Sequence, residues 1–408
     1  MTAHRHAQWR NLPGHLRFNP QYPHPGPPLL SCKHMPEPPK TVTVTTTSSS
    51  YEVHIGTGLL ATLGPRIVAL TAHSPSVFVV TSPEIWSLWS ERFLASFETK
   101  PTILTIPSGE QHKRLSTLEH LAEQMANARA DRDSVLVAFG GGVIGDMTGF
   151  LAAMYMRGIR YIAVPTTLLA QVDSSLGGKT GVNLAAGKNL IGSFHHPLAV
   201  FADTDVLATL SPAQLRAGLQ ESIKAGIIRD RALFEFLETE SQTILAADPH
   251  ALAYVIAASV RVKADVVAAD EFETGVRMLL NLGHTLGHAI ESATSYTQLL
   301  HGEAVAWGMV AAIRIAAARN LVTSAEAARM NAVIHTYGPL QPFTAEVATL
   351  IANTAKDKKN RSGARSFVLP IGIGDATVVR DISEAELLSA TQEIVYEAEH
   401  ATSRSTPV

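Results

Sequence analysis

The residues best suited to chemistry in this chain lie in NLGHTLGHAIE, residues 281–291, and in the segment HGE that begins at His301. Residues four apart stack on one face of an α-helix, so His284 and His288 are expected to point the same way. Two imidazoles on one face, with His301 returning nearby, could hold a metal ion or an anion together. The alternative for such a pair is a hydrogen-bonded helix face without a ligand.

A carboxylate that could join this site lies in the helical segment AQLRAGLQESIKAGII, residues 213–228. Glu221 and Lys224 are three apart there and share one face of the helix. One interpretation is an exposed ion pair. The neighbouring residues are mostly apolar, however, which predicts a buried helix. A buried glutamate needs a cationic partner, and a metal ion is one candidate.

A glycine-rich turn, GGGVIGD at residues 140–146, joins a predicted strand at 134–139 to a predicted helix at 147–158. Glycines in this position let backbone N–H groups approach a pyrophosphate at the positive end of the helix. The turn does not follow the first strand, and no acidic residue stands about twenty residues later, so the standard Rossmann fingerprint is not met. A dinucleotide site remains the prediction, with a plain tight turn as the alternative.

Two further segments combine glycine with lysine, serine and asparagine: DSSLGGKTGVN at 173–183 and GKNLIG at 187–192. As loops, they would present backbone donors and ammonium groups together, which suits a phosphate or carboxylate ligand. Two solvated turns are the alternative.

Composition limits the functions that these residues can serve. The chain has 408 residues, 46% of them hydrophobic, and a formal net charge of -3, so it can bury a large core and offers no general basic field for nucleic acid. The single cysteine, Cys32, excludes an intramolecular disulfide and fits a reducing, cytoplasmic compartment. The N-terminal residues lack the apolar core of a signal peptide, and arginines interrupt the most apolar late run, so neither export nor a membrane partner is expected.

Periodicity predicts how the chain is divided. Residues 1–40 are rich in Pro and His without a hydrophobic period, which predicts a disordered N-terminal extension. Residues 41–210 alternate strands and helices, which predicts an α/β domain with a mostly parallel, Rossmann-like sheet. Helical patterns then follow one another almost throughout, so residues 211–395 are predicted to form an all-α domain, followed by a flexible tail at 396–408.

Several long motifs resemble the 3-dehydroquinate synthase family of sugar-phosphate cyclases. They are the run from Gly140 to Phe194, ESIKAGIIRD, RMLLNLGHTLGHAIE, HGEAVAWGM and DKKNRSGARSFVLPIGIG. The resemblance covers about residues 50–385. It implies an NAD-binding α/β domain, a helical domain that binds metal and substrate, an active site between them, and a homodimer.

The family pattern makes Glu221, His284 and His301 the ligands of one divalent metal ion, zinc or cobalt. It places His288 beside the substrate, whereas the spacing alone suggested a ligand of the metal. A site with one carboxylate and two imidazoles keeps coordination positions open, as a catalytic metal requires.

The same pattern assigns further polar residues to the substrate and to NAD. The expected catalytic residues are Asp173, Lys179, Lys224, Arg277, Asn281 and His288. The expected substrate-binding residues are Asn189 and Lys263, with Arg157 and Lys358 at the phosphate end, where Lys359 is the alternative to Lys358. The expected NAD-binding residues are Glu110, Lys113, Gly141, Gly142, Val143, Asp146, Thr166, Thr167, Leu169, Lys179, Lys188 and Thr209. Relatives often carry Asp and Asn after the strand VFVV, where this chain has TSPE at 81–84, so ribose contacts from that turn stay open.

The implied reaction converts 3-deoxy-D-arabino-heptulosonate 7-phosphate to 3-dehydroquinate and phosphate, a step of the shikimate pathway to aromatic amino acids, and the enzyme would be a carbon–oxygen lyase. NAD would take a hydride, phosphate would be eliminated, the hydride would return, and an intramolecular aldol reaction would close the ring. Cationic side chains would hold the substrate's phosphate and carboxylate.

Relatives that act on sedoheptulose 7-phosphate, which lacks the carboxylate, alter the positions of Arg277, Asn281 and the second histidine. Arg277 is the expected discriminator, because a guanidinium has a bidentate carboxylate partner only in the acid. A metal-dependent polyol dehydrogenase and a catalytically inactive NAD-binding protein are the remaining alternatives.

Overall fold

A computed structural model describes residues 41–71, 73, 75–273, 275–355 and 366–401 of the chain. The extension expected at residues 1–40 and the two alternative lysines, Lys358 and Lys359, lie outside the described residues.

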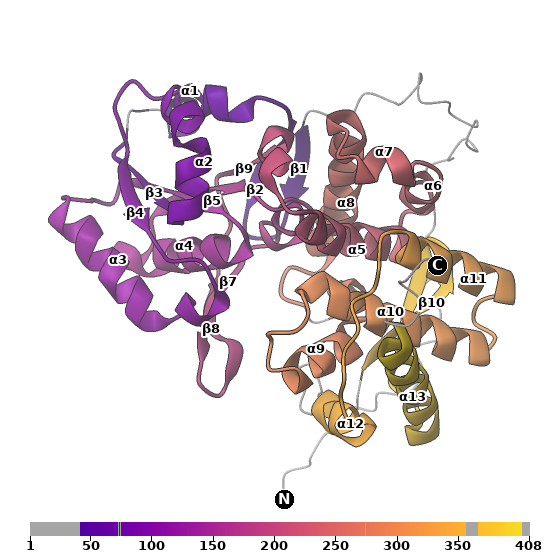
Figure 1. Cartoon of the computed structure of the whole chain (residues 1–408). Coiled ribbons are helices and arrows are strands. Elements are labelled where there is room, and N and C mark those ends of the chain that lie inside the picture. The colour runs from indigo at the N-terminus through magenta and orange to yellow at the C-terminus, as the bar shows by residue number, and fades with distance from the viewer. Residues whose placement is uncertain (1–40, 72, 74, 274, 356–365, 402–408) are drawn as a thin grey trace, which may run out of the picture. The chain divides into compact units, whose positions relative to one another are not determined.

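A seven-stranded sheet organises the first half of the described chain (Figure 1). Its strands, in spatial order, are β1 (Thr41–Thr45), β2 (Ser50–Gly56), β9 (Ala199–Asp203), β6 (Arg160–Pro165), β5 (Val135–Gly140), β3 (Val77–Thr81) and β4 (Thr102–Thr105). β1 pairs antiparallel with β2, and the remaining pairs are parallel. The predicted mostly parallel α/β sheet is therefore confirmed.

Helices surround this sheet because its central strands are apolar on both faces. Every residue of β5 is buried, which is typical of a parallel strand covered on two sides. The helices of this part are α1 (Leu63–Thr71), α2 (Pro83–Leu94), α3 (Leu115–Asn127) and α4 (Gly142–Met154). Leu63 and Phe93 pack with Val137, Phe139 and Phe201 in one buried core, whereas α4 packs against β5 and β6.

The glycine-rich turn lies at the point where the strand order reverses. The chain passes from β3 outward to β4 and then returns to the other side of β3 to form β5. Parallel sheets bind ligands at the carboxyl ends of strands at such a point. Gly140 ends β5 and Gly142 begins α4, so the turn has the position that a dinucleotide site requires.

The segments expected as two anion-binding loops form an antiparallel hairpin instead. β7 (Lys179–Leu184) pairs with β8 (Gly187–Phe194), and the hairpin packs against α4 (Figure 1). The loop prediction was wrong because these strands have no clear hydrophobic alternation. Their glycines, which resemble turn signals, serve the pairing instead, since Gly181 faces Gly192 across the two strands.

The second half of the chain is mainly helical, as expected. Its helices are α5 (Pro212–Ile228), α6 (Arg231–Thr239), α7 (Ser241–Leu245), α8 (Pro249–Ala269), α9 (His284–Ala293), α10 (His301–Ala318), α11 (Ser324–Thr336), α12 (Val347–Ala355) and α13 (Glu384–His400). The Ser-Pro start of α5 is confirmed, because the Ser211 hydroxyl accepts a hydrogen bond from the Gln214 N–H. None of the described helices is long and apolar enough to cross a membrane.

Two details differ from the expected all-α domain with a tail from residue 396. Strands β10 (Phe367–Gly372) and β11 (Asp375–Val379) form an antiparallel pair within this part. α13 continues through His400, so the expected start of the tail falls inside a helix. The proposed domain boundary at 210/211 stays a prediction, since α8 packs directly on β1 and β2.

Candidate active site

Three helices bring the predicted metal ligands together. Glu221 comes from α5, His284 begins α9 and His301 begins α10, and one ligand atom from each lies within 4.8 Å of the others. The Glu221 Oε1 atom is 3.9 Å from His284 Nε2 and 3.7 Å from His301 Nε2. Donors that share a tetrahedral zinc ion are roughly 3.4 Å apart, so this spacing suits an ion after a small adjustment.

The state of Glu221 also fits a metal ion. The residue is 3% exposed, and its Oε1 atom is buried with no hydrogen-bond partner among the described residues. A buried carboxylate oxygen without a partner is costly, and a divalent cation would satisfy it. Residues Glu221, His284 and His301 are therefore the ones that could hold the metal.

Glycines fix the spacing of these three helices. A Cβ atom at Gly302 would lie 1.9 Å from the Ala217 carbonyl oxygen of α5, and one at Gly308 would lie 1.8 Å from the Gly283 carbonyl oxygen before α9. α10 therefore touches its neighbours backbone to backbone, and larger residues cannot occupy these positions without moving a helix. The helices that carry the ligands form one closely packed frame.

Charged residues surround the three ligands. The Lys224 ammonium bonds to the second oxygen of Glu221, and Lys263 donates to both the carboxylate and the main-chain carbonyl of Asp173, each at 2.6 Å. Burial alone would raise the pKa of Asp173, but the charges of Lys263 and Lys224 outweigh it and lower the pKa. Burial would lower the pKa of Lys224, but Glu221 and Asp173 raise it. Burial lowers the pKa of Lys263, although the charge of Asp173 opposes this shift.

Asp173 reaches this cluster through an irregular segment of the chain. It lies in a π-helix, Ala170–Ser174, that packs against α4, α5 and α8. A wide helical turn of this kind is frequent at functional sites. The expected substrate residues Asp173 and Lys263 are thereby placed beside the expected metal ligands.

His288 lies next to the ligands without belonging to their group. Its ring centroid is 5.3 Å from that of His284 and 6.0 Å from that of His301. With Glu291 and His301 it forms a second group whose ligand atoms lie within 4.8 Å of one another. The position beside the metal ligands is compatible with the expected role at the substrate.

Comparisons with known proteins identify the family to which this chain belongs. A model described as 3-dehydroquinate synthase N-terminal matches residues 103–217, and one described as 3-dehydroquinate synthase C-terminal matches residues 218–360. A 3-dehydroquinate synthase from Solibacter usitatus is 46% identical over 349 residues, which cover 85% of this chain and 97% of that protein. The chain belongs to the 3-dehydroquinate synthase family.

Two solved structures extend the comparison to bound groups. The 2-epi-5-epi-valiolone synthase ValA from Streptomyces hygroscopicus, with NAD+ and Zn2+ bound, is 29% identical, with a TM-score of 0.77 over 86% of this chain and 99% of that chain. A 2-deoxy-scyllo-inosose synthase complexed with carbaglucose-6-phosphate, NAD+ and Co2+ has a TM-score of 0.76 at the same identity and coverage. The dehydroquinate synthase-like fold expected from the sequence is confirmed.

On the cofactor side of this dehydroquinate synthase family member, one polar network joins three of the expected NAD residues, Glu110, Lys113 and Asp146. The Lys113 ammonium donates to Asp146 Oδ2 and to Asn189 Oδ1, both at 2.6 Å. Asn183 donates to Glu110 at 2.7 Å and accepts the Asn189 N–H at 2.8 Å. The β7–β8 hairpin is therefore tied to the start of α4, beside the glycine-rich turn.

The remaining expected NAD residues follow the strand ends. Gly141 and Val143 flank Gly142 at the start of α4, and the Thr166 N–H bonds to the Gly140 carbonyl at 3.0 Å. Thr167 and Leu169 continue from β6 toward the π-helix. Thr209 follows β9 instead of β5 or β6. Its hydroxyl accepts a hydrogen bond from Trp89 at 3.1 Å.

The segment TSPE at 81–84, which stands where Asp and Asn were expected, leads into α2. Ser82 caps α2 and Pro83 is its first residue. The Glu84 carboxylate accepts a hydrogen bond from Ser108 at 2.7 Å. Ribose contacts from this turn therefore stay open, as the sequence left them.

The Arg277 guanidinium is buried rather than presented to a cavity. It is 2% exposed, and its two terminal nitrogens donate to the main-chain carbonyls of Glu271 and Gly177. Its Nε atom is buried without a partner among the described residues. A bidentate contact to a substrate carboxylate would require these main-chain bonds to rearrange.

The structure does not bring Arg157 to the cluster. Arg157 is exposed just beyond the end of α4, whereas Gly142 begins α4 beside Ser174. The thirteen residues of α4 span about 20 Å, so Arg157, beyond the far end of this helix, lies well away from Ser174 and the adjacent Asp173 of its own chain. Met156 and Arg157 both have positive φ values, 49° and 71°, which is an uncommon conformation for such residues.

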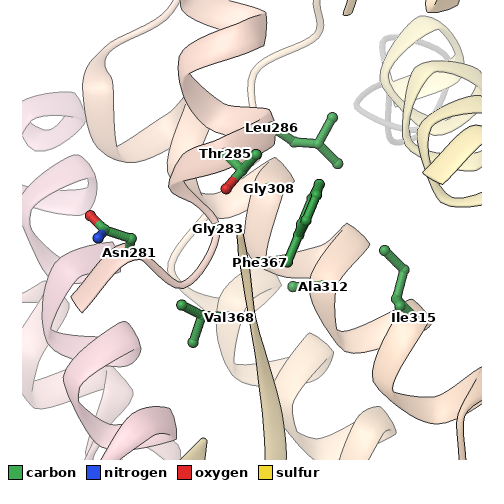
Figure 2. A pocket seen from close by; sticks show the side chains of 9 residues that line it. All are labelled: Asn281, Gly283, Thr285, Leu286, Gly308, Ala312, Ile315, Phe367 and Val368. Atoms are coloured by element: carbon green, nitrogen blue, oxygen red, sulfur yellow. The ribbon is translucent and has the colours of Figure 1, made fainter. Parts of the chain in front are cut away.

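A small hollow lies behind the histidine helix, not at the ligands. Figure 2 shows the residues that line it, from the 3-10 helix η7 (Val276–Asn281), the turn before α9, α9 itself, α10 and β10: Asn281, Gly283, Thr285, Leu286, Gly308, Ala312, Ile315, Phe367 and Val368. The lining is mostly apolar, and Asn281 stands at its side. The hollow belongs to the core that supports α9, and none of the three expected metal ligands lines it.

Two carboxylates at the site had no role in the sequence analysis. Glu273 accepts hydrogen bonds from Lys179 and, at 2.9 Å, from Asn281, so it joins two expected catalytic residues from distant segments. Glu291 pairs with His301 and Lys188. The spacing of His288 and Glu291 on one helix was the available signal for Glu291, whereas no local pattern marked Glu273.

Proposed function

We propose that this chain acts as a 3-dehydroquinate synthase, a carbon–oxygen lyase that converts 3-deoxy-D-arabino-heptulosonate 7-phosphate to 3-dehydroquinate and phosphate. The observation that carries the proposal is the convergence of Glu221, His284 and His301 beside the Asp173–Lys263 pair. It occurs in a chain whose relatives with that name are 43–46% identical over most of their length.

NAD and one divalent metal ion, zinc or cobalt, are the cofactors. When bound, they supply a reversible hydride acceptor and a Lewis acid. Glu221, His284 and His301 would hold the metal. The glycine-rich turn before α4, together with Lys113 and Asp146, would hold NAD.

The chain's own residues bind and orient the substrate. Lys224 and Lys263 present two buried ammonium groups, and such groups attract a phosphorylated acid strongly in a site of low dielectric constant. Glu221 and Asp173 accept hydrogen bonds from these ammonium groups and so hold them in place. Lys179 is exposed at the edge of this cluster, where Glu273 orients its ammonium group.

The expected phosphate-binding role of Arg157 requires a second copy of the chain. Its distance from the cluster along α4 prevents it from serving its own site. The homodimer expected from the sequence would supply it from the other subunit. By the same family resemblance, we propose that the chain forms a homodimer, acts in the cytoplasm and has no nucleic-acid partner.

A substrate comparison tests the proposal. Purified protein with NAD and zinc is expected to release inorganic phosphate from the heptulosonate 7-phosphate with no net accumulation of NADH, because the hydride returns within each turnover. Sedoheptulose 7-phosphate, tested at the same concentration, serves as the comparison substrate. Turnover of sedoheptulose 7-phosphate without turnover of the acid would overturn the proposed substrate and leave the family unchanged.

A further inference from the structure

We propose that Glu291 is a positioning residue that fixes the His301 ring for metal binding and connects it to the β7–β8 hairpin. The inference rests on the proposed function, since it takes His301 as a metal ligand. Glu291 is not one of the three expected metal ligands.

The first contact orients the imidazole. His301 Nδ1 lies 3.4 Å from Glu291 Oε2, whereas His301 Nε2 faces Glu221 at 3.7 Å. An ionised carboxylate can only accept, so Nδ1 carries the proton of this bond and Nε2 keeps its lone pair. Histidines that bind metals are commonly held this way by a carboxylate behind the ring, which fixes the tautomer and raises the basicity of the ligand nitrogen.

The second contact comes from the other half of the chain. Lys188, on β8, places its ammonium 3.6 Å from Glu291 Oε1 and 4.0 Å from the centroid of the Tyr296 ring. Glu291 is 6% exposed, so its charge needs partners, and Lys188 supplies the cationic one. One carboxylate therefore contacts an expected metal ligand and an expected NAD residue at the same time.

A second metal ion is the competing explanation for the same residues. Glu291, His288 and His301 could also act as ligands, since their donor atoms lie within 4.8 Å of one another. The hydrogen bond favours positioning, because His301 Nδ1 then carries a proton and has no lone pair to offer a second ion. The two explanations differ in the number of metal ions bound per chain.

The experiment measures zinc affinity and stoichiometry rather than turnover. The metal-free proteins compete with a zinc-binding dye, and bound zinc is counted by elemental analysis. Glu291→Leu removes the acceptor at similar size, Glu291→Gln keeps an acceptor oxygen without the charge, and Ser292→Gln changes the exposed neighbour as a control. Circular dichroism of the metal-free proteins checks that each variant is folded.

We expect Glu291→Leu to weaken zinc binding by about 10- to 100-fold and Glu291→Gln by less. Ser292→Gln should bind zinc as the unchanged protein does, with one zinc per chain in every case. Lys188→Gln, which leaves the His301 bond intact, should change the zinc affinity by no more than about fivefold.

Unchanged zinc affinity in folded Glu291→Leu would overturn the proposal, as would two zinc ions per chain that fall to one in this variant. If the unchanged protein bound zinc but released no phosphate from the heptulosonate 7-phosphate, the proposed function would fail while the affinity series still tested Glu291.

Discussion

The Glu221–Lys224 pair gives a sharp test of the charge arrangement at the site. Lys224 is 3% exposed, and it bonds to the one Glu221 oxygen that does not face the histidines. Glu221→Gln preserves the volume of the side chain but leaves a buried ammonium group without its bonded carboxylate. Breaking a buried ion pair from one side costs about 3–5 kcal/mol of unfolding free energy. Asp173 still faces Lys224, so we expect the lower end, about 3 kcal/mol.

The measurement uses the metal-free protein, so that loss of the metal does not contribute. In chains of about 200 residues, 1 kcal/mol corresponds to roughly 2–4 °C in Tm, and the shift per kcal/mol falls as chains lengthen. We therefore expect Tm to fall by about 5 °C in Glu221→Gln. The double variant Glu221→Gln with Lys224→Met removes both charges and should recover most of this loss, because replacing a whole buried pair by apolar groups is often neutral.

Two results would refute the reasoning. One is a Glu221→Gln variant within about 1 °C of the unchanged protein, which would mean that Lys224 has other sufficient partners. The other is a double variant less stable than the single one, which would mean that the pair stabilises the fold beyond its own charge balance. Zinc titration of the same variants separately tests Glu221 as a ligand, since each should lose zinc binding.

Further predictions concern acid stability, helix spacing and metal linkage. The hydrogen bond from Arg319 holds the pKa of Glu386 at about 2, so this contact stabilises the fold above the usual glutamate value of 4.5 and is lost as the pH falls toward 2. Glu386→Gln should lower Tm at pH 7 and flatten its fall below pH 5, measured by thermal denaturation. Gly308→Ala should destabilise the protein by at least about 1–3 kcal/mol, because its Cβ atom would overlap a main-chain oxygen, whereas Gly145→Ala, with open space around it, should not. Zinc at about 100 times its Kd should stabilise the unchanged protein by about 2.7 kcal/mol and leave the stability of His284→Ala unchanged.

The sequence predicted the helices and strands well where one face is buried, because burial imposes a regular spacing of apolar residues. The parallel sheet, the Ser-Pro start of α5 and the histidine helix all have strong local signals, either apolar runs or capping residues. The β7–β8 hairpin was missed because its residues are mostly polar or glycine and because β8 has no buried residue. The β10–β11 pair was missed among helical patterns for a related reason: two short strands carry little periodicity of their own.

The site was predictable as a set of residues but not as a set of contacts. Residue type and spacing alone suggested a metal or anion site with His284 and His288, and Glu221 as a possible buried partner of a metal. The expected ligand set of Glu221, His284 and His301 came from the family resemblance. Two contacts depend on how distant segments of the chain meet. One is the carboxylate bonded to His301, and the other is the link that Glu273 makes between Lys179 and Asn281. Arg277 shows the same limit. Its residue type suggested that it binds a substrate carboxylate, yet in the fold its terminal nitrogens donate hydrogen bonds to main-chain carbonyls.

The glycine contacts at Gly302 and Gly308 have a consequence for inhibitor design. Because α10 touches both α5 and the residue before α9 backbone to backbone, a chelating compound would meet three ligands whose main chains cannot move apart, so that only their side chains can adjust. The β7–β8 hairpin, by contrast, is held by side chains such as Lys113 and Lys188. Selective compounds should therefore match the fixed geometry at the metal and gain affinity from groups that displace those lysine contacts.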